Sequence, residues 1–99
     1  MLNIQTKTEG DTLVMALEGK IDSASAPDFD KAVKEYAPDA GKLVLDFEKV
    51  DYISSAGLRV LLTADKIMKR AGGMTIIHTN DIVNEVFEVT GFSRILTIE

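Results

Sequence analysis

The strongest constraint on the fold is a strand-like, helix-like, strand-like order in the second half of the chain. Residues 42–47 contain Leu43-Val44-Leu45, which are apolar at consecutive positions, as expected of a strand covered on both faces. A helical pattern follows at 55–71, and 74–78 returns to a strand pattern. Because strand–helix–strand connections are right-handed and join parallel strands, this unit predicts an α/β fold with a central parallel pair.

The first third of the chain predicts a β-hairpin followed by a helix. Residues 2–7 alternate apolar and polar side chains and indicate an edge strand. Residues 13–17 are apolar on both faces of the strand and indicate a deeper position in the sheet. Turn-forming residues at 9–11 join the two strands. The motif at 25–28, Ser-Ala-Pro-Asp, is typical of a capping box, so we expect Ser25 to cap a helix that stops at Pro38.

The last third predicts one more helix and a short final strand at 95–98. Four apolar residues share one helical stripe that stops at Gly91, namely Ile82, Val83, Val86 and Phe87. Together these segments predict a single domain over residues 1–99. The expected fold class is α/β, with a mixed sheet of four to five strands and three to four helices packed mainly on one face.

Composition narrows the classes of partner. Eleven Lys and Arg against sixteen Asp and Glu give a net charge of −5, which disfavours binding to nucleic acid or to an anionic membrane. The lack of cysteine excludes disulfides and thiolate sites and fits a reducing compartment. Residues 1–7 do not resemble a signal peptide, and no window approaches the ~18 apolar residues of a membrane span. We therefore expect a cytoplasmic protein with a protein partner and no direct membrane contact.

Two adjacent serines, Ser54 and Ser55, begin the long helical pattern that follows the central strand. Functional loops gather at the carboxyl ends of strands in open α/β sheets, and we expect 51–58 to include such a loop. A serine at a helix start commonly caps the helix by accepting a backbone N–H. The same position also suits a phosphoserine, because first-turn amides and the helix dipole favour an anion. Both interpretations stay open on the local pattern.

The first turns of this helix hold a glycine and two leucines outside the predicted core stripe. Gly57 costs a helix about 1 kcal/mol relative to alanine, so it indicates close helix–sheet packing, access of another protein to Ser55, or both. Leu58 and Leu62 are either the margin of the core or, if exposed together, part of a partner surface. The predicted core stripe consists of Val60, Leu61, Ala64, Ile67, Met68 and Ala71.

Little in the sequence resembles a catalytic or metal centre. His78 is the one histidine, and neither a G-x-S-x-G elbow nor a phosphate-binding glycine loop accompanies it. A single histidine with scattered carboxylates does not predict a metal site. We therefore expect no enzymatic activity, no metal and no cofactor. Asp22, after the second strand, has the pattern of a turn or cap residue.

Four motifs follow one another at a characteristic spacing: Gly19-Lys20-Ile21-Asp22, Leu43-Val44-Leu45-Asp46-Phe47, the segment 52–62 around Ser54-Ser55-Ala56-Gly57-Leu58, and Gly73-Met74. They resemble the STAS domain of bacterial anti-sigma factor antagonists, over nearly the whole chain. The resemblance implies a transcription regulator that works by partner switching. Such a regulator binds an anti-sigma factor serine kinase, releases a sigma factor, is switched off by phosphorylation of a serine, and is reset by a serine phosphatase.

This resemblance also assigns the candidate residues. Counting back from Gly57-Leu58 makes Ser55 the phosphorylated serine, with Ser54 as the alternative. Ser54 stands where related sequences have an aspartate, and Ala56 where they have a second hydroxyl residue. Asp22 matches an acidic loop residue beside the phosphorylation site. The candidate partner-binding residues are Asp22, Ser54, Ser55, Ala56, Gly57, Leu58 and Leu62.

Two other classes of function remain. STAS-like domains also serve as cytoplasmic accessory subunits of ABC-type lipid transporters or other membrane assemblies, where the serine need not be phosphorylated. Such a subunit would copurify with an ABC ATPase, whereas the regulator would copurify with a soluble ATP-binding kinase. An enzyme is the third class, and the missing catalytic constellations disfavour it.

Overall fold

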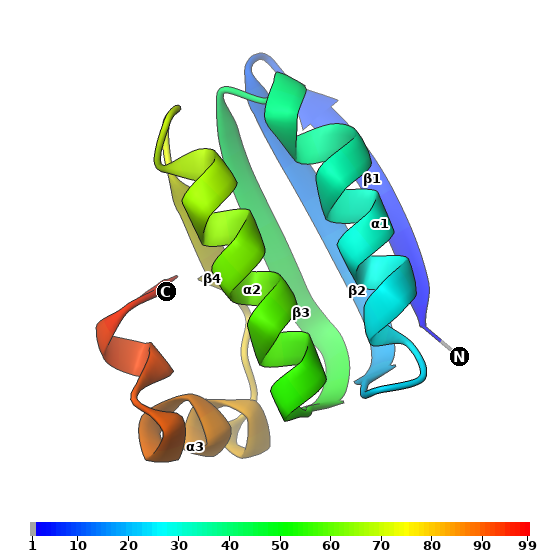
Figure 1. Ribbon diagram of the computed structural model, residues 1–99, viewed down its shortest axis with the longest axis vertical. Helices are drawn as coiled ribbons and strands as arrows, with labels where there is room; N and C mark the ends of the chain where they lie inside the picture. Colours follow the sequence, from blue (N-terminus) through cyan, green and yellow to red (C-terminus); the bar gives the residue numbers. More distant parts are fainter. Residues whose placement is uncertain (1) are drawn as a thin grey trace.

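One five-stranded sheet, in the order β1-β2-β3-β4-β5, forms the centre of the computed structural model (Figure 1). The structure describes residues 2–99, so Met1, where the predicted domain begins, lies outside the described residues. Strand β1 pairs antiparallel with β2, and the other neighbouring pairs are parallel. The predicted mixed sheet and its parallel central pair are therefore confirmed. The strands are β1 (Asn3–Glu9), β2 (Thr12–Ile21), β3 (Lys42–Ile53), β4 (Met74–Ile77) and β5 (Thr97–Ile98).

Three α-helices connect these strands: α1 (Ala26–Tyr36), α2 (Ser55–Met68) and α3 (Asp81–Thr90). Short 3-10 helices follow α1 at Ala37–Asp39 and α3 at Phe92–Arg94. Figure 1 shows α1 and α2 side by side over one face of the sheet, with α3 near the end where β3 finishes and α2 begins. Within residues 2–99, none of the helices is both long enough and apolar enough to cross a bilayer.

The core lies between the sheet and helices α1 and α2. On β2 the buried and half-buried residues alternate, and the buried set includes Met15, Leu17 and Ile21. This alternation is the period of a strand with one covered face. The opposite face is open, because Val44 and Asp46 on β3 are only half-buried. The prediction that the central strand is covered on both faces is therefore wrong, although three consecutive residues of it are apolar.

Three local predictions also fail for identifiable reasons. Ser25 does not cap α1, because its backbone is already helical and its hydroxyl donates to the Lys20 carbonyl at 2.8 Å instead. Helix α2 ends at Met68, three residues before the predicted end, and Ala71 is exposed. On α3, Val83 and Phe87 are buried, but Ile82 is 58% exposed because the apolar stripe is wider than the contact with the core.

Candidate functional site

The ends of β2 and β3 lie side by side at the carboxyl edge of the sheet. Ile21 pairs with Ile53, and the Ser54 N–H donates to the Ile21 carbonyl at 2.8 Å. Parallel pairing therefore brings the loop that starts at Asp22 next to the start of α2. The connection itself is shorter than expected, because β3 continues to Ile53 and Ser54 alone separates it from α2. Residues 51–53 therefore belong to the strand, and the helix begins at Ser55 as predicted.

Ser54 and Ser55 differ sharply in accessibility. Ser54 is the N-terminal flanking residue of α2, yet its side chain makes no capping hydrogen bond. Its Oγ is buried and, among residues 2–99, has no hydrogen-bond partner. Ser55 is the first helical residue and is exposed. The first-turn amides of α2 thus lie beside an exposed hydroxyl, and the capping role that sequence allowed for Ser54 is not formed.

Gly57 is buried where α2 comes closest to the sheet. A Cβ added there would lie 2.6 Å from Cγ2 of Ile21 and 2.7 Å from Cγ1 of Ile53. Real Cβ atoms do not approach other carbons so closely, so a side chain here would displace core residues. Of the two interpretations of Gly57, the structure supports close packing, because its missing side chain would point into the core and not toward a visiting protein.

Leu58 and Leu62 do not form the exposed pair that the helical wheel allowed. Leu58 is 5% exposed and belongs to the core, and Leu62 is half-buried. Of the two interpretations of Leu58, the structure supports the margin of the core, because the buried residues of α2 include Gly57 and Leu58 in its first turn. Gly57 and Leu58 therefore offer no side chain to a partner. Leu62 and Ala56, both half-buried, stay candidates.

Asp22 organises the loop between β2 and α1. Its Oδ1 accepts the N–H groups of Ala24 and Ser25, each at 3.0 Å, and lies 3.2 Å from the Ser25 hydroxyl. The bond from the Ser25 backbone lowers the pKa of the Asp22 carboxyl below its ordinary value, because it stabilises the charged form. The turn role predicted from the local pattern is confirmed. A role in binding a partner stays a prediction.

A depression beside this loop carries mostly negative charge. Its charged lining consists of Asp22, Asp28, Asp51 and Lys20. Three carboxylates against one ammonium make this end of the molecule acidic, which agrees with the net charge of −5. A protein that docks here therefore meets carboxylates and complements them best with cations.

A second group of polar side chains, which no sequence motif predicted, lies on the open face of the sheet. His78 Nδ1 is 3.0 Å from Asp46 Oδ1 and 3.7 Å from Glu48 Oε1. The hydrogen bond to Asp46 raises the pKa of His78 above its ordinary value. The carboxylates described as scattered in the sequence thus converge on the one histidine. The signal was present, because Asp46 and Glu48 are two positions apart on β3 and His78 directly follows β4.

Comparison with known sequences relates residues 3–99 to the STAS domain family. The chain is 37% identical over 89 residues to BtrV of Bordetella bronchiseptica, described as a candidate anti-sigma factor antagonist, covering 87% of this chain and 76% of BtrV. It is 26% identical over 98 residues to the anti-sigma-B factor antagonist of Bacillus subtilis, covering 98% of this chain and 90% of that protein.

Solved structures share the fold. An anti-sigma factor antagonist from Mycobacterium paratuberculosis gives a TM-score of 0.91 at 19% identity, covering 99% of this chain and 85% of that one. The Bacillus cell fate determinant SpoIIAA, solved in its phosphorylated form, gives 0.74 at 15% identity, covering 98% and 91%. At such identities the likeness bears on the fold, and it confirms the predicted STAS-like architecture.

Proposed function

The chain belongs to the STAS domain family, and from this premise we propose that it is an anti-sigma factor antagonist switched off by phosphorylation of Ser55. In its unmodified form it binds a kinase-type anti-sigma factor in the cytoplasm and so releases a sigma factor. The kinase phosphorylates Ser55, and a serine phosphatase restores the unmodified state. The domain is the substrate in this cycle and catalyses none of its steps. The names of its relatives support the general role.

The observation that carries the assignment to Ser55 is the contrast between the two serines. Ser55 is exposed at the start of α2, whereas the Oγ of Ser54 is buried. A kinase must bring the γ-phosphate of ATP into line with the attacking hydroxyl, which requires that hydroxyl to be reachable. Ser55 meets this requirement without any rearrangement, and Ser54 does not.

The setting of Ser55 also favours the phosphorylated product. Helix α2 has 14 residues, and the side chain of Ser54 does not cap its first-turn amides. A phosphate on Ser55 would lie near these donors and at the positive end of the helix dipole. The domain can therefore hold the modification at low cost, while its surface changes in charge.

Phosphorylation in vitro tests the proposal. The purified chain is incubated with its anti-sigma kinase and ATP, and the phosphate is located by peptide fragmentation in a mass spectrometer. We expect one phosphate on the wild type and on Ser54→Ala, and none on Ser55→Ala. Phosphate on Ser54, or stoichiometric phosphate in Ser55→Ala, would contradict the assignment.

A binding experiment separates this proposal from the transporter alternative. The unmodified chain should form a stable complex with a soluble ATP-binding kinase, and the complex should be lost after phosphorylation. Copurification with a membrane-bound ABC ATPase, unaffected by Ser55→Ala, would support the accessory subunit instead.

A further inference from the structure

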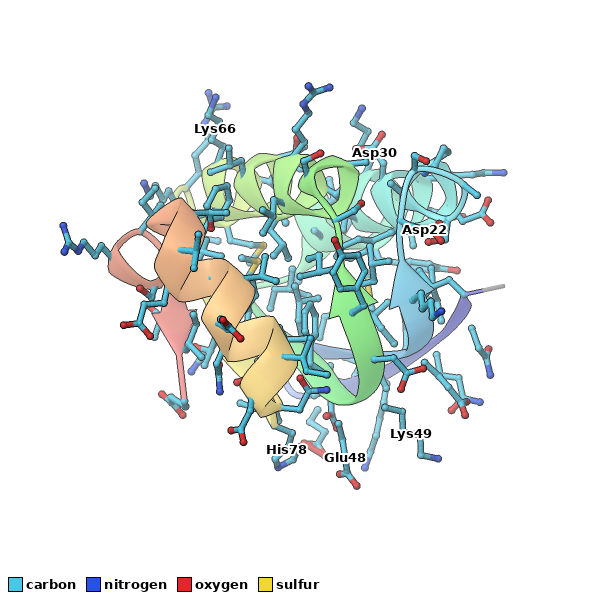
Figure 2. The ribbon with its side chains drawn as sticks, turned by 90° about the horizontal axis from the view of Figure 1, so that it is seen from below. Asp22, Asp30, Glu48, Lys49, Lys66 and His78 are labelled. Carbon is cyan, nitrogen blue, oxygen red and sulfur yellow. The ribbon has the colours of Figure 1, made fainter. Side chains whose placement is uncertain are left out.

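The open face of the sheet carries the one cluster of metal-ligating side chains found among residues 2–99. We propose that Asp46, Glu48 and His78 form a binding site for a divalent transition-metal ion of the zinc type. The proposal does not rest on the function of Ser55. Figure 2 shows Glu48 and His78 together on the side of the molecule away from α1 and α2.

Strand pairing brings the three residues together. Asp46 pairs with Ile77 at the end of the parallel β3–β4 ladder, and His78, the next residue, leaves the strand with a φ of 61° and contacts Asp46. Glu48 follows Asp46 by two positions, and its N–H donates to Asp46 Oδ1 at 3.0 Å. This bond holds the Asp46 carboxylate in place, as outer contacts commonly do for metal ligands. The ligand set thus combines two residues of β3 with the first residue after β4.

The distances suit a small ion. His78 Nδ1 lies 3.0 Å from Asp46 Oδ1 and 3.7 Å from Glu48 Oε1, and the donor atoms of all three residues lie within 4.8 Å of one another. Zinc holds nitrogen and oxygen donors at about 2.0–2.2 Å, so tetrahedral donors are about 3.3–3.6 Å apart. The observed separations fall on either side of this value. Small rotations of exposed Glu48 and His78 would place all three donors around one ion.

The donor types select the class of metal. One imidazole nitrogen with two carboxylates suits zinc, nickel or copper, whereas magnesium and calcium prefer oxygen donors alone. Three protein ligands with a water in the fourth position are a common zinc arrangement. Asp46 and Glu48 also line a surface depression, and the exposure of Glu48 and His78 leaves the site open to water. A hydrogen-bonded His78–Asp46 pair without metal is the competing explanation of the geometry.

His78 offers an unusually clean probe. It is the one histidine of the 99 residues, so imidazole signals in an NMR spectrum report this position alone. Its backbone has a φ of 61°, in the left-handed region, which asparagine adopts more readily than most residues. His78→Asn therefore removes the ring and keeps a compatible backbone. Glu48→Gln, at an exposed position, removes one carboxylate with little risk to the fold.

The test is titration of the untagged, metal-free chain with zinc chloride, followed by calorimetry and by the His78 ring resonances. We expect saturable binding of one ion with shifted ring signals, and at least about tenfold weaker binding in His78→Asn and in Glu48→Gln. Glu85→Gln, an exposed carboxylate on α3, serves as the matched control and should bind like the wild type.

Three outcomes would overturn the proposal. Unshifted His78 ring signals at saturation would mean that zinc binds elsewhere. Equal affinity in the wild type, His78→Asn and Glu48→Gln would mean that the cluster is only a hydrogen-bonded pair beside a second carboxylate. Displacement of zinc by an equal concentration of magnesium would mean that the carboxylates attract cations without a built site.

Discussion

At the scale of single residues, the first turn of α2 separates side chains that hold the fold from those that face outward. Gly57 and Leu58 are buried, whereas Ser55, two residues earlier, is exposed. The helical period predicted the difference between buried and exposed positions in the middle of the helix, but not in its first turn. The first turn contacts the ends of two strands, and those contacts depend on a strand pairing that helical spacing does not encode.

Truncation of the two leucines should therefore have different consequences. Leu58→Ala should lower the free energy of unfolding by about 2–5 kcal/mol, because it opens a cavity in the core. Leu62→Ala should cost less, since Leu62 is half-buried. Urea unfolding of the two variants measures both losses. If Leu62 also belongs to the partner surface, Leu62→Ala should bind the anti-sigma factor more weakly even under conditions where the variant is fully folded. A larger stability loss for Leu62→Ala than for Leu58→Ala would contradict this assignment.

The loop carboxylate Asp22 should make stability depend on pH in the acidic range. Its pKa is lowered in the folded chain, so its hydrogen bonds stabilise the fold above the unfolded pKa of about 3.9 and are lost as pH falls through the folded value. In Asp22→Asn the part of this dependence that comes from Asp22 should disappear, so the stability gap between the two proteins should narrow as pH falls. The measurement is urea unfolding between neutral and acidic pH, with Ser23→Ala as a control in the same loop. If the free energies of unfolding of the wild type and Asp22→Asn differed by the same amount at every pH, this explanation would be ruled out.

At the scale of elements, the sequence predicted which segments are strands and helices more accurately than where they end. Strand β3 extends six residues beyond the predicted 42–47, because pairing with β2 continues through irregular register to Ile53. The segment 48–53 gave no strand signal, because its polar and apolar residues do not alternate regularly where the register with β2 shifts. Signals carried by a single residue were more dependable, as at Gly91, which ends α3 in the left-handed conformation.

Helix α3 depends on one asparagine at its start. Asn80 Oδ1 accepts the Val83 N–H at 2.8 Å, and its Nδ2 donates to the Val50 carbonyl at 2.9 Å, which ties α3 to β3. Asn80→Ala should lower the free energy of unfolding by about 0.5–2 kcal/mol for the lost cap, and it also removes the hydrogen bond to the Val50 carbonyl. Asn80→Asp keeps the cap and removes only the hydrogen bond to Val50, so it should lower the stability less than Asn80→Ala does. Hydrogen exchange of α3 amides measures the local effect, and equal protection in all three proteins would contradict it.

At the scale of the whole molecule, the parallel pairing of β2 with β3 is what assembles the candidate site. Asp22 and Ser55 are far apart in sequence and belong to different connections, yet the Ile21–Ile53 pair brings their loops to the same edge. The order of elements was enough to predict that edge as functional. The same pairing logic applied to β3 and β4 gathers Asp46, Glu48 and His78, which no linear motif predicted. Spacing within a strand is readable from sequence, whereas contact between strands requires their register.

Phosphorylation of Ser55 should change the binding of the domain without unfolding it. The phosphate adds about −1.5 to −2 of charge, which takes the net charge from −5 to roughly −7. It does so at the amino end of α2, where the helix dipole stabilises an anion, so the melting temperature should stay nearly unchanged.

In a complex the same charge has the opposite effect. It would lie at the same edge of the sheet as the acidic loop that starts at Asp22, and a docked partner would have to neutralise it or bury it unpaired. Losses of paired interfacial charges cost about 2–5 kcal/mol, which corresponds to about 30-fold to several-thousand-fold weaker binding. The test compares the phosphorylated and unmodified chains in melting temperature and in affinity for the partner. Kinase-treated Ser55→Ala serves as the control. Loss of affinity and of thermal stability in parallel would mean that the switch acts by unfolding, and loss of neither would remove Ser55 from the switch.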